Sequence, residues 1–205
     1  MPQGAATQFK DVNEITPTGK VERTVYKGVE PKSQVYLKTF GPMEFNRTNR
    51  AEFNMLIKLV SIKLRESLRE DKSGVYGVGV NGSPKKYPKQ GYDIVVSFGC
   101  APDNVELLIK AAIDEIEKIK ANGCDEKDLQ KIKETALRER ESDLKENNFW
   151  LAAISQSYLN AEDIIEIENY ANIVNGISSE KLKQLANKYL SMDNYARFVL
   201  MPEKK

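Results

Sequence analysis

An arginine and a tyrosine, Arg69 and Tyr76, are the residues whose types and spacing could do chemistry in this sequence. They lie seven residues apart, on either side of the turn residues Ser73-Gly74. We expect a helix to end near Arg69 and a strand to begin near Tyr76, so that both side chains face one groove at an edge of a sheet. A guanidinium and a phenol both donate hydrogen bonds. Each could stabilise an oxygen atom that develops negative charge in a transition state, by about 3–4 kcal/mol per donor in the best measured cases.

Each of the two residues also has a purely structural interpretation. The positive charge of Arg69 in the last turn of a helix would complement the helix dipole. Glu66, three residues before Arg69, could also form an ion pair with it. Arg65, however, precedes Arg69 by four residues on the same helix face, a repulsive placement that local helix stability does not explain. Tyr76 could be a core aromatic residue, because it shares its strand face with Val78.

The helix that must position Arg69 is predicted from a stripe of apolar residues. Their spacings are four, three, four and four, and the members are Phe53, Ile57, Val60, Leu64 and Leu68. Such a stripe indicates a helix of about five turns. Its broad apolar face predicts packing on a sheet, and Thr48 or Asn49 could cap its start.

The remaining pattern predicts an α+β domain. Strands are expected over residues 21–29, 34–40, 75–80, 92–98 and 195–201, and further helices over residues 102–122, 125–146, 150–158, 163–172 and 179–190. The third and fourth strands are joined by a polar hairpin-type loop, which makes them antiparallel neighbours. The order β-β-α-β-β-α-α-α-α-α-β predicts an antiparallel sheet of about five strands, with helices packed on one face.

The chain is expected to form one domain with a short extension. Residues 1–20 contain Pro2, Gly4, Pro17 and Gly19 with little periodicity, which predicts a linker or tail. Residues 21–205 are then a single domain. With 205 residues, of which 40% are hydrophobic, the chain can bury a substantial core.

The charge balance argues against nucleic acid or an anionic membrane surface as a partner. The chain has 31 basic and 30 acidic residues, a net charge of +1, and therefore no strong field to gather a polyanion. One loop combines lysines with aromatic residues: Lys85, Lys86, Lys89, Tyr87 and Tyr92. Against the near-neutral net charge, this loop is predicted to be a solvated hairpin.

The cysteines and the hydropathy argue against a disulfide-rich protein and against a membrane-spanning one. Cys100 and Cys124 are too few for a disulfide framework and do not form a C-x-x-C motif, so we expect free thiols. No run of 18 apolar residues occurs, and the first ten residues lack an apolar segment of the signal-peptide type. We therefore expect no membrane span and no signal peptide, and the compartment stays unknown.

The helix, turn and strand around the pair resemble part of the non-catalytic half of the pitrilysin/insulinase zinc peptidases. That half carries an L-R-E…G-x-Y segment with the same spacing of seven between arginine and tyrosine, as in Leu68-Arg69-Glu70 and Gly74-Val75-Tyr76 here. Three other stretches look like successive landmarks of that half: KGVEPKSQV (27–35), NNFWL (147–151) and ISSEKLKQLANKYLSMDNYARFVLMPE (177–203). The resemblance covers roughly residues 21–203.

The resemblance implies the non-catalytic half of a two-part zinc metalloendopeptidase. The family's inverted zinc motif, H-x-x-E-H, cannot exist in a chain without histidine. The resemblance therefore implies no cofactor in this chain, and zinc in a partner catalytic half on the same polypeptide or on a separate subunit. It also implies that Arg69 and Tyr76 bind the backbone of a peptide substrate. The isolated chain would be inactive.

A second function, from a different class, is a scaffold or assembly domain of the same fold without any link to proteolysis. Core subunits of respiratory complexes that resemble this family are of that kind. The presence of both Arg69 and Tyr76 favours substrate binding, because a scaffold has no reason to keep the pair together.

Overall fold

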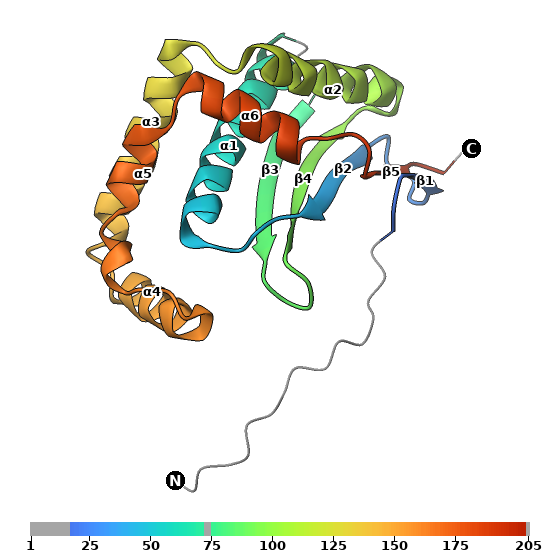
Figure 1. The fold of residues 1–205 in the computed structure, drawn as a ribbon. Coiled ribbons are helices and arrows are strands. Elements are labelled where there is room, and N and C mark those ends of the chain that lie inside the picture. Colours follow the sequence, from blue (N-terminus) through green and yellow to red (C-terminus); the bar gives the residue numbers. More distant parts are fainter. Residues whose placement is uncertain (1–16, 72–74, 204–205) are drawn as a thin grey trace, which may run out of the picture.

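The computed structural model describes residues 17–71 and 75–203, apart from the side chains of Glu70, Asp71 and Tyr76. It contains a five-stranded sheet whose strands are β1 (Lys20–Tyr26), β2 (Ser33–Pro42), β3 (Val75–Lys85), β4 (Gly91–Cys100) and β5 (Tyr195–Met201). Their order in space is β1-β5-β2-β4-β3, so the last strand lies between the first two (Figure 1). β1 and β3 are therefore the two edges of the sheet.

The sheet is mixed, which corrects the prediction of an antiparallel sheet at one pair of strands. β1 runs parallel to β5, with Lys20 opposite Tyr195 and Tyr26 opposite Met201. The pairs β2–β5, β2–β4 and β3–β4 are antiparallel, as predicted. Parallel strands need a long crossover connection. Here the whole domain between the two strands forms that crossover, which a strand-by-strand interpretation of the sequence does not detect.

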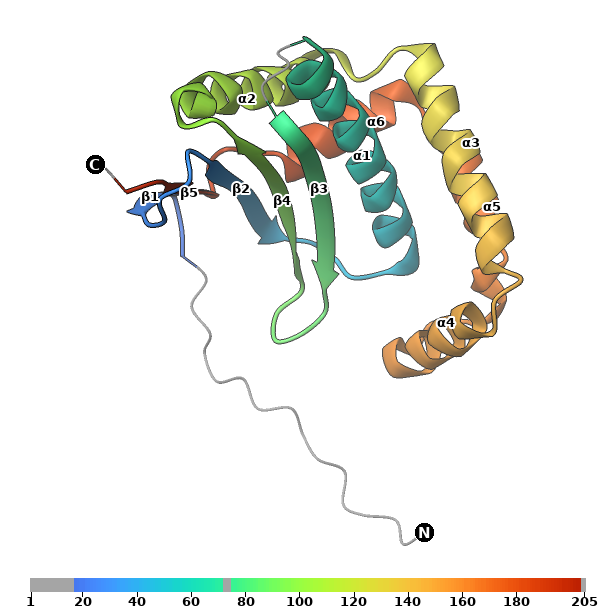
Figure 2. The same cartoon turned by 180° about the vertical axis from the view of Figure 1, so that it is seen from behind.

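The helices cover one face of the sheet, as predicted (Figures 1 and 2). The helices are α1 (Arg47–Arg65), α2 (Val105–Asn122), α3 (Glu126–Asp143), α4 (Asn147–Asn160), α5 (Tyr170–Gly176) and α6 (Ser179–Tyr189). Three short helical segments are η1 (Glu66–Asp71), η2 (Pro102–Asn104) and η3 (Ile165–Ile167). α1 packs on β3, while α2 and α6 contact β2. α3 and α5 contact the side of α1, so the α+β class is confirmed.

α1 is formed by the predicted apolar stripe. Phe53, Leu64 and Leu68 are fully buried, the last of them in η1. The helix is capped by Asn46, whose side chain accepts a hydrogen bond from the backbone N–H of Asn49 at 2.8 Å. Thr48 and Asn49, the predicted caps, are already helical residues. The first turn therefore begins earlier than predicted.

The helix predicted over residues 163–172 is displaced toward the C-terminus. α4 ends with Ala161 in the left-handed conformation at φ 55°, and residues 165–167 form a single 3-10 turn before α5 begins at Tyr170. The Asp163 carboxylate accepts a hydrogen bond from the backbone N–H of Ile165 at 3.0 Å. Such a side-chain turn competes with the helical conformation and delays the start of α5.

The core lies between the sheet and the helices. Every second residue of β4 is buried, from Tyr92 to Cys100. The rings of Phe53, Tyr92 and Tyr189 meet there, with centroids 4.9–5.8 Å apart. Of the predicted linker, residues 1–16 lie outside the described residues, and its last residue, Lys20, already begins β1. No helix in the described ranges is both long enough and apolar enough to cross a bilayer.

A close contact between α1 and the sheet occurs at Gly82 of β3, and it can be tested with alanine. A Cβ atom at Gly82 would lie 2.5 Å from atoms of both Phe53 and Ile57, whereas a Cβ at Gly77 on the same strand would meet nothing within 4 Å. Gly82→Ala is expected to lower the free energy of unfolding by about 1–3 kcal/mol through overpacking. Urea denaturation measures this, with Gly77→Ala as the matched control. Equal stability of the two variants would contradict the packing.

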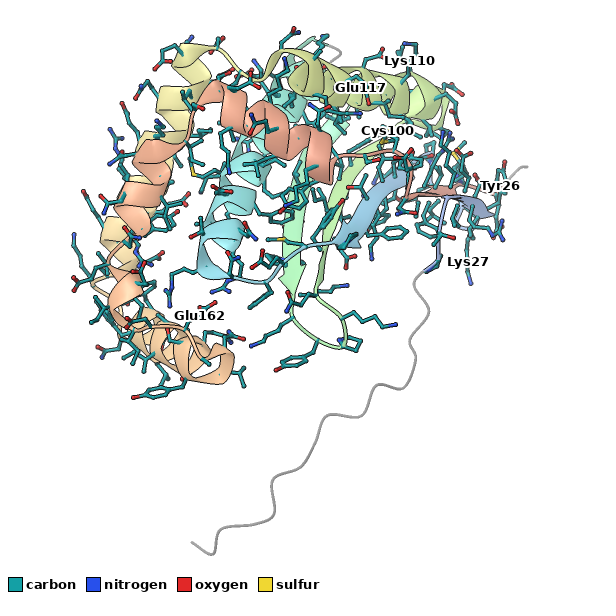
Figure 3. The ribbon with its side chains drawn as sticks, viewed as in Figure 1. Tyr26, Lys27, Cys100, Lys110, Glu117 and Glu162 are labelled. Carbon is teal, nitrogen blue, oxygen red and sulfur yellow. The ribbon has the colours of Figure 1, made fainter. Side chains whose placement is uncertain are left out.

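Glu162 connects the end of α4 to the first turn of α1 (Figure 3). Its two carboxylate oxygens accept hydrogen bonds from the two terminal nitrogens of Arg50, at 2.6 and 2.7 Å. The side chain of Glu162 is only 15% exposed. The hydrogen bonds from Arg50 lower the pKa of Glu162 below its ordinary value.

Glu162→Gln is therefore expected to lower the free energy of unfolding at pH 7 by about 1–3 kcal/mol. Because the pKa of Glu162 is lower in the folded chain, the carboxylate's contribution is complete above the unfolded pKa of about 4.3. It is lost as the pH falls through the folded pKa. Denaturation at decreasing pH should show the wild type converging on the variant. The exposed Glu168→Gln is the control, and a difference that persists in acid contradicts the assignment.

Candidate functional site

Arg69 lies in η1, a π-helix that continues α1. Leu64 of α1 and Leu68 of η1 are both fully buried, so the buried side of α1 continues into η1. The side chain of Arg69 is exposed. Single turns of π-helix inside α-helices are uncommon and occur frequently at functional sites.

The pairing of Arg69 with Glu66, the structural alternative, does not form. Glu66 instead faces two lysines, with Lys63 at 3.6 Å and Lys131 at 3.8 Å. In the part of the chain that the structure describes, no ion pair involves Arg69. Within those residues, its guanidinium is therefore not used to join η1 to a neighbouring element.

Tyr76 lies in β3 at a break in the strand pairing. Val75 pairs with Cys100 and Gly77 pairs with Gly99, so Tyr76 is the extra residue of a β-bulge. β3 is an edge strand of the sheet. Bulges are common at sheet edges and next to active sites, where they redirect a side chain. The side chain of Tyr76 itself lies outside the described part of the structure.

The backbone brings the two positions to one corner of the sheet. η1 contacts both β3 and α2, and only residues 72–74, which lie outside the described ranges, separate it from β3. The predicted helix end and strand start are therefore present, whereas the predicted turn at Ser73-Gly74 lies outside the described residues. At this corner there is a groove of about 410 Å³. It is lined by the small residues Ser33, Gly77, Gly79, Ser97 and Gly99, together with Lys32, Gln34 and Phe98.

The uncovered face of the sheet carries exposed apolar residues that were not among the predicted site residues. Tyr36, Phe198 and Leu200 are exposed there by 46%, 43% and 43%. A strand with one solvated face normally alternates apolar and polar residues. In β5, Phe198 and Leu200 instead alternate with Val199, which is buried, so both faces of the strand are apolar. That double apolar pattern could have indicated a binding face.

Neither cysteine is suited to nucleophilic chemistry. Cys100 and Cys124 are free thiols, which confirms the prediction. Burial raises the pKa of both thiols above the ordinary value, so they stay protonated at neutral pH. They are structural residues of the core and its border.

The residues that the structure describes do not fit a zinc ion. The chain has no histidine, and the described residues contain no group of three or more cysteine, aspartate or glutamate side chains placed to hold a metal. Asp128, a buried acidic residue of α3, is instead paired with Lys63 at 2.7 Å. Their hydrogen bond raises the pKa of Lys63 and connects α1 to α3.

Comparison with curated proteins finds a zinc protease. Over 106 residues the chain is 28% identical to "Zinc protease PQQL-like" of Arabidopsis thaliana. The match covers 49% of this chain and 11% of that protein. The chain thus spans a small part of the length of the relative it matches.

Comparison with solved structures finds the same fold in proteases. The ferredoxin protease FusC, solved as a mutant in complex with Arabidopsis ferredoxin, superposes with a TM-score of 0.82 at 21% identity, over 97% of this chain and 22% of that one. The periplasmic protease PqqL of Escherichia coli gives 0.79 at 21% identity, over 91% and 21%. An M16 inactive domain from Pseudomonas fluorescens gives 0.73 at 17% identity, over 91% and 44%.

The sequence also matches a protein family directly. Residues 3–136, more than half of the chain, match the family described as "Peptidase M16 inactive domain". The match agrees with the missing zinc ligands and with the resemblance to the non-catalytic half of the zinc peptidases. The chain belongs to the M16 peptidase inactive-domain family.

Proposed function

We propose that this chain is the substrate-gripping, non-catalytic half of a two-part zinc metalloendopeptidase. Arg69 and Tyr76 hold the backbone of a peptide substrate, beside a zinc site on a catalytic half that carries H-x-x-E-H. That half is covalently linked or a separate subunit. The observation that carries the proposal is that both residues occupy local irregularities, a π-helix and a β-bulge, at the same corner of the sheet.

The chemistry of the pair fits a role in binding and in stabilising charge. When water attacks a peptide carbonyl, the carbonyl oxygen gains negative charge, and a phenol or guanidinium donor aimed at it lowers the barrier. A guanidinium can also donate two parallel hydrogen bonds to backbone oxygens. Neither group activates water, so hydrolysis depends on the partner half. The FusC structure supports the substrate class, because it records a relative of this fold as a protease with a protein bound.

The first test uses the isolated 205-residue chain. We expect it to fold, to cleave no peptides and to bind no stoichiometric zinc, because it has no histidine to ligate the metal. Metal analysis after dialysis against equimolar zinc measures the content, and a quenched fluorescent peptide library measures cleavage. One tightly held zinc per chain, or turnover by the chain alone, would overturn its assignment to the non-catalytic half.

The second test concerns the pair in the complete enzyme. Tyr76→Phe should lower kcat/KM about ten- to a thousandfold, because the phenol no longer donates to the developing oxyanion. Arg69→Lys should lower turnover nearly as far as Arg69→Ala, since lysine keeps the charge but loses the planar two-point grip. Peptide cleavage assays measure both, and the melting temperature of each variant should stay near that of wild type.

The pair is also expected to act as a unit. Combining Arg69→Ala with Tyr76→Phe should cost less than the sum of the separate losses, because both residues hold one substrate. Lys131→Gln, an exposed charge change near η1, is the matched control and should leave turnover unchanged. Full activity of Tyr76→Phe and Arg69→Lys would return both residues to structural roles and favour the scaffold function.

A further inference from the structure

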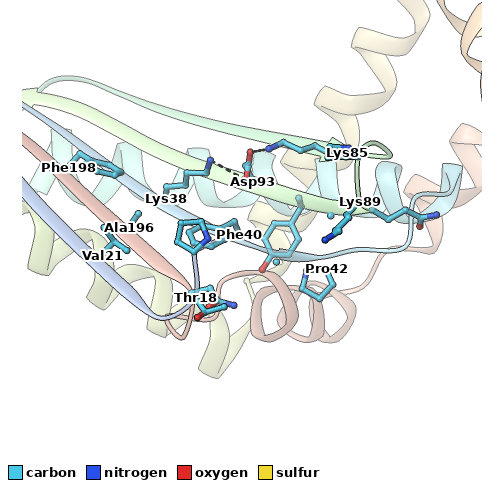
Figure 4. A pocket seen from close by; sticks show the side chains of 17 residues that line it. Thr18, Val21, Lys38, Phe40, Pro42, Lys85, Lys89, Asp93, Ala196 and Phe198 are labelled. Carbon is cyan, nitrogen blue, oxygen red and sulfur yellow. Dashed lines mark ion pairs between the residues drawn. The ribbon is translucent and has the colours of Figure 1, made fainter. Parts of the chain in front are cut away.

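A second pocket lies on the uncovered face of the sheet, at the end away from Arg69 and Tyr76. Its volume is about 520 Å³ (Figure 4). The floor is apolar, formed by Val21, Phe40, Ala196 and Phe198. It extends to the loop that joins β3 to β4, so strands from both edges of the sheet contribute to it.

The charged residues of this pocket are strongly biased toward lysine. Among the described residues that line it, Lys38, Lys85 and Lys89 are basic and Asp93 alone is acidic. Asp93 lies on β4, between Lys38 on β2 and Lys85 on β3. Both lysines form ion pairs with Asp93, and the Lys38–Asp93 distance is 3.3 Å (Figure 4). One carboxylate can neutralise only one of these two ammonium groups.

The two ammonium groups are placed to accept another anion. The side chains of Lys38 and Lys85 are 36% and 48% exposed, whereas that of Asp93 is only 17% exposed. The inner carboxylate thus holds both lysines above the apolar floor while solvent reaches their outer sides. A carboxylate that enters from solvent would meet two positive charges, beside aromatic and aliphatic surface.

We propose that this pocket binds an acidic side chain, flanked by apolar residues, of an extended peptide. Charge complementarity selects the carboxylate, and the floor of Phe40 and Phe198 selects its apolar neighbours. The proposal rests on the function proposed above and deepens it, because the ligand is a segment of the substrate that Arg69 and Tyr76 hold.

The path between the two sites fits an extended chain. β3 advances eight residues from Gly77 to Lys85, about 26 Å at about 3.3 Å per residue. The groove at Gly77, Gly79 and Gly99 begins that path, and Gln34 and Lys32 also line it. A peptide lying along it would place its acidic residue about eight residues from the bond held at the Arg69–Tyr76 corner.

The test measures binding to the 205-residue chain alone, without catalysis. The probe is a fluorescein-labelled, amidated octapeptide with Phe-Glu-Leu at its centre, and the comparison peptide has Phe-Gln-Leu. Fluorescence anisotropy at low salt should give a dissociation constant at least tenfold lower for the glutamate peptide. The preference should shrink as salt is added, because the contact is ionic. Equal affinity for the two peptides would overturn the proposal.

Four variants make the test specific to this pocket. Lys38→Gln and Lys85→Gln should each abolish most of the preference for glutamate. Lys110→Gln, the same charge change on α2 (Figure 3), should retain it. Asp93→Asn should bind the glutamate peptide several-fold more tightly than wild type, because the competing inner carboxylate is gone. Melting temperatures show that each variant is folded.

The outcomes separate this proposal from the function proposed above. If Lys38 and Lys85 serve only to neutralise Asp93, the Asp93→Asn variant will not bind the glutamate peptide more tightly than wild type. That result would overturn the proposed binding site. A glutamine peptide with a free C-terminus that binds as tightly as the glutamate peptide would overturn the choice of an acidic side chain. Failure of the Arg69 and Tyr76 variants to change turnover would leave all of these binding results in place.

Discussion

The close packing of α1 against β3 is the constraint on which the candidate site depends. Gly82 has no side chain, so Phe53 and Ile57 can approach the strand directly. α1 therefore lies directly against an edge strand. η1, which continues α1, then ends beside the start of that strand, which brings the candidate positions Arg69 and Tyr76 to one corner of the sheet. A bulkier residue at Gly82 would displace the helix, and with it the position of Arg69 relative to the bulge at Tyr76.

The sheet has two faces with different physical roles. One face is filled by the helices and holds the aromatic contacts of Phe53, Tyr92 and Tyr189. The other face leaves Phe198 and Leu200 exposed beside glycines and lysines. Exposed apolar surface next to polar groups is typical of a binding surface. The buried core thus lies on one face of the sheet, and the other face stays exposed to solvent and accessible to a ligand.

The candidate groups of this chain are donors and cations. Arg69, Tyr76, Lys38 and Lys85 can hold a carbonyl oxygen or a carboxylate. These groups suit the proposed binding of a peptide, and the chain belongs to a family of inactive peptidase domains.

The sequence by itself determined most of the secondary structure and the position of the candidate pair. The stripe from Phe53 to Leu68, the alternation in β4 and the turn signals each depend on neighbours within a few residues, so local periodicity is sufficient to predict them. The missing histidine excluded a zinc site of the family's kind in this chain at once. The spacing of Arg69 and Tyr76 was also visible, although their roles stay a proposal.

Only the tertiary structure decided the pairing of distant strands and the second pocket. β1 and β5 pair in parallel although most of the domain lies between them in the sequence, and no local pattern encodes that pairing. Lys38, Lys85 and Asp93 belong to three strands and converge only when the sheet forms. The π-helix and the β-bulge likewise were not predicted from the sequence. The strand pairing and the second pocket depend on contacts between residues that are far apart in the sequence, so a local sequence pattern cannot predict them.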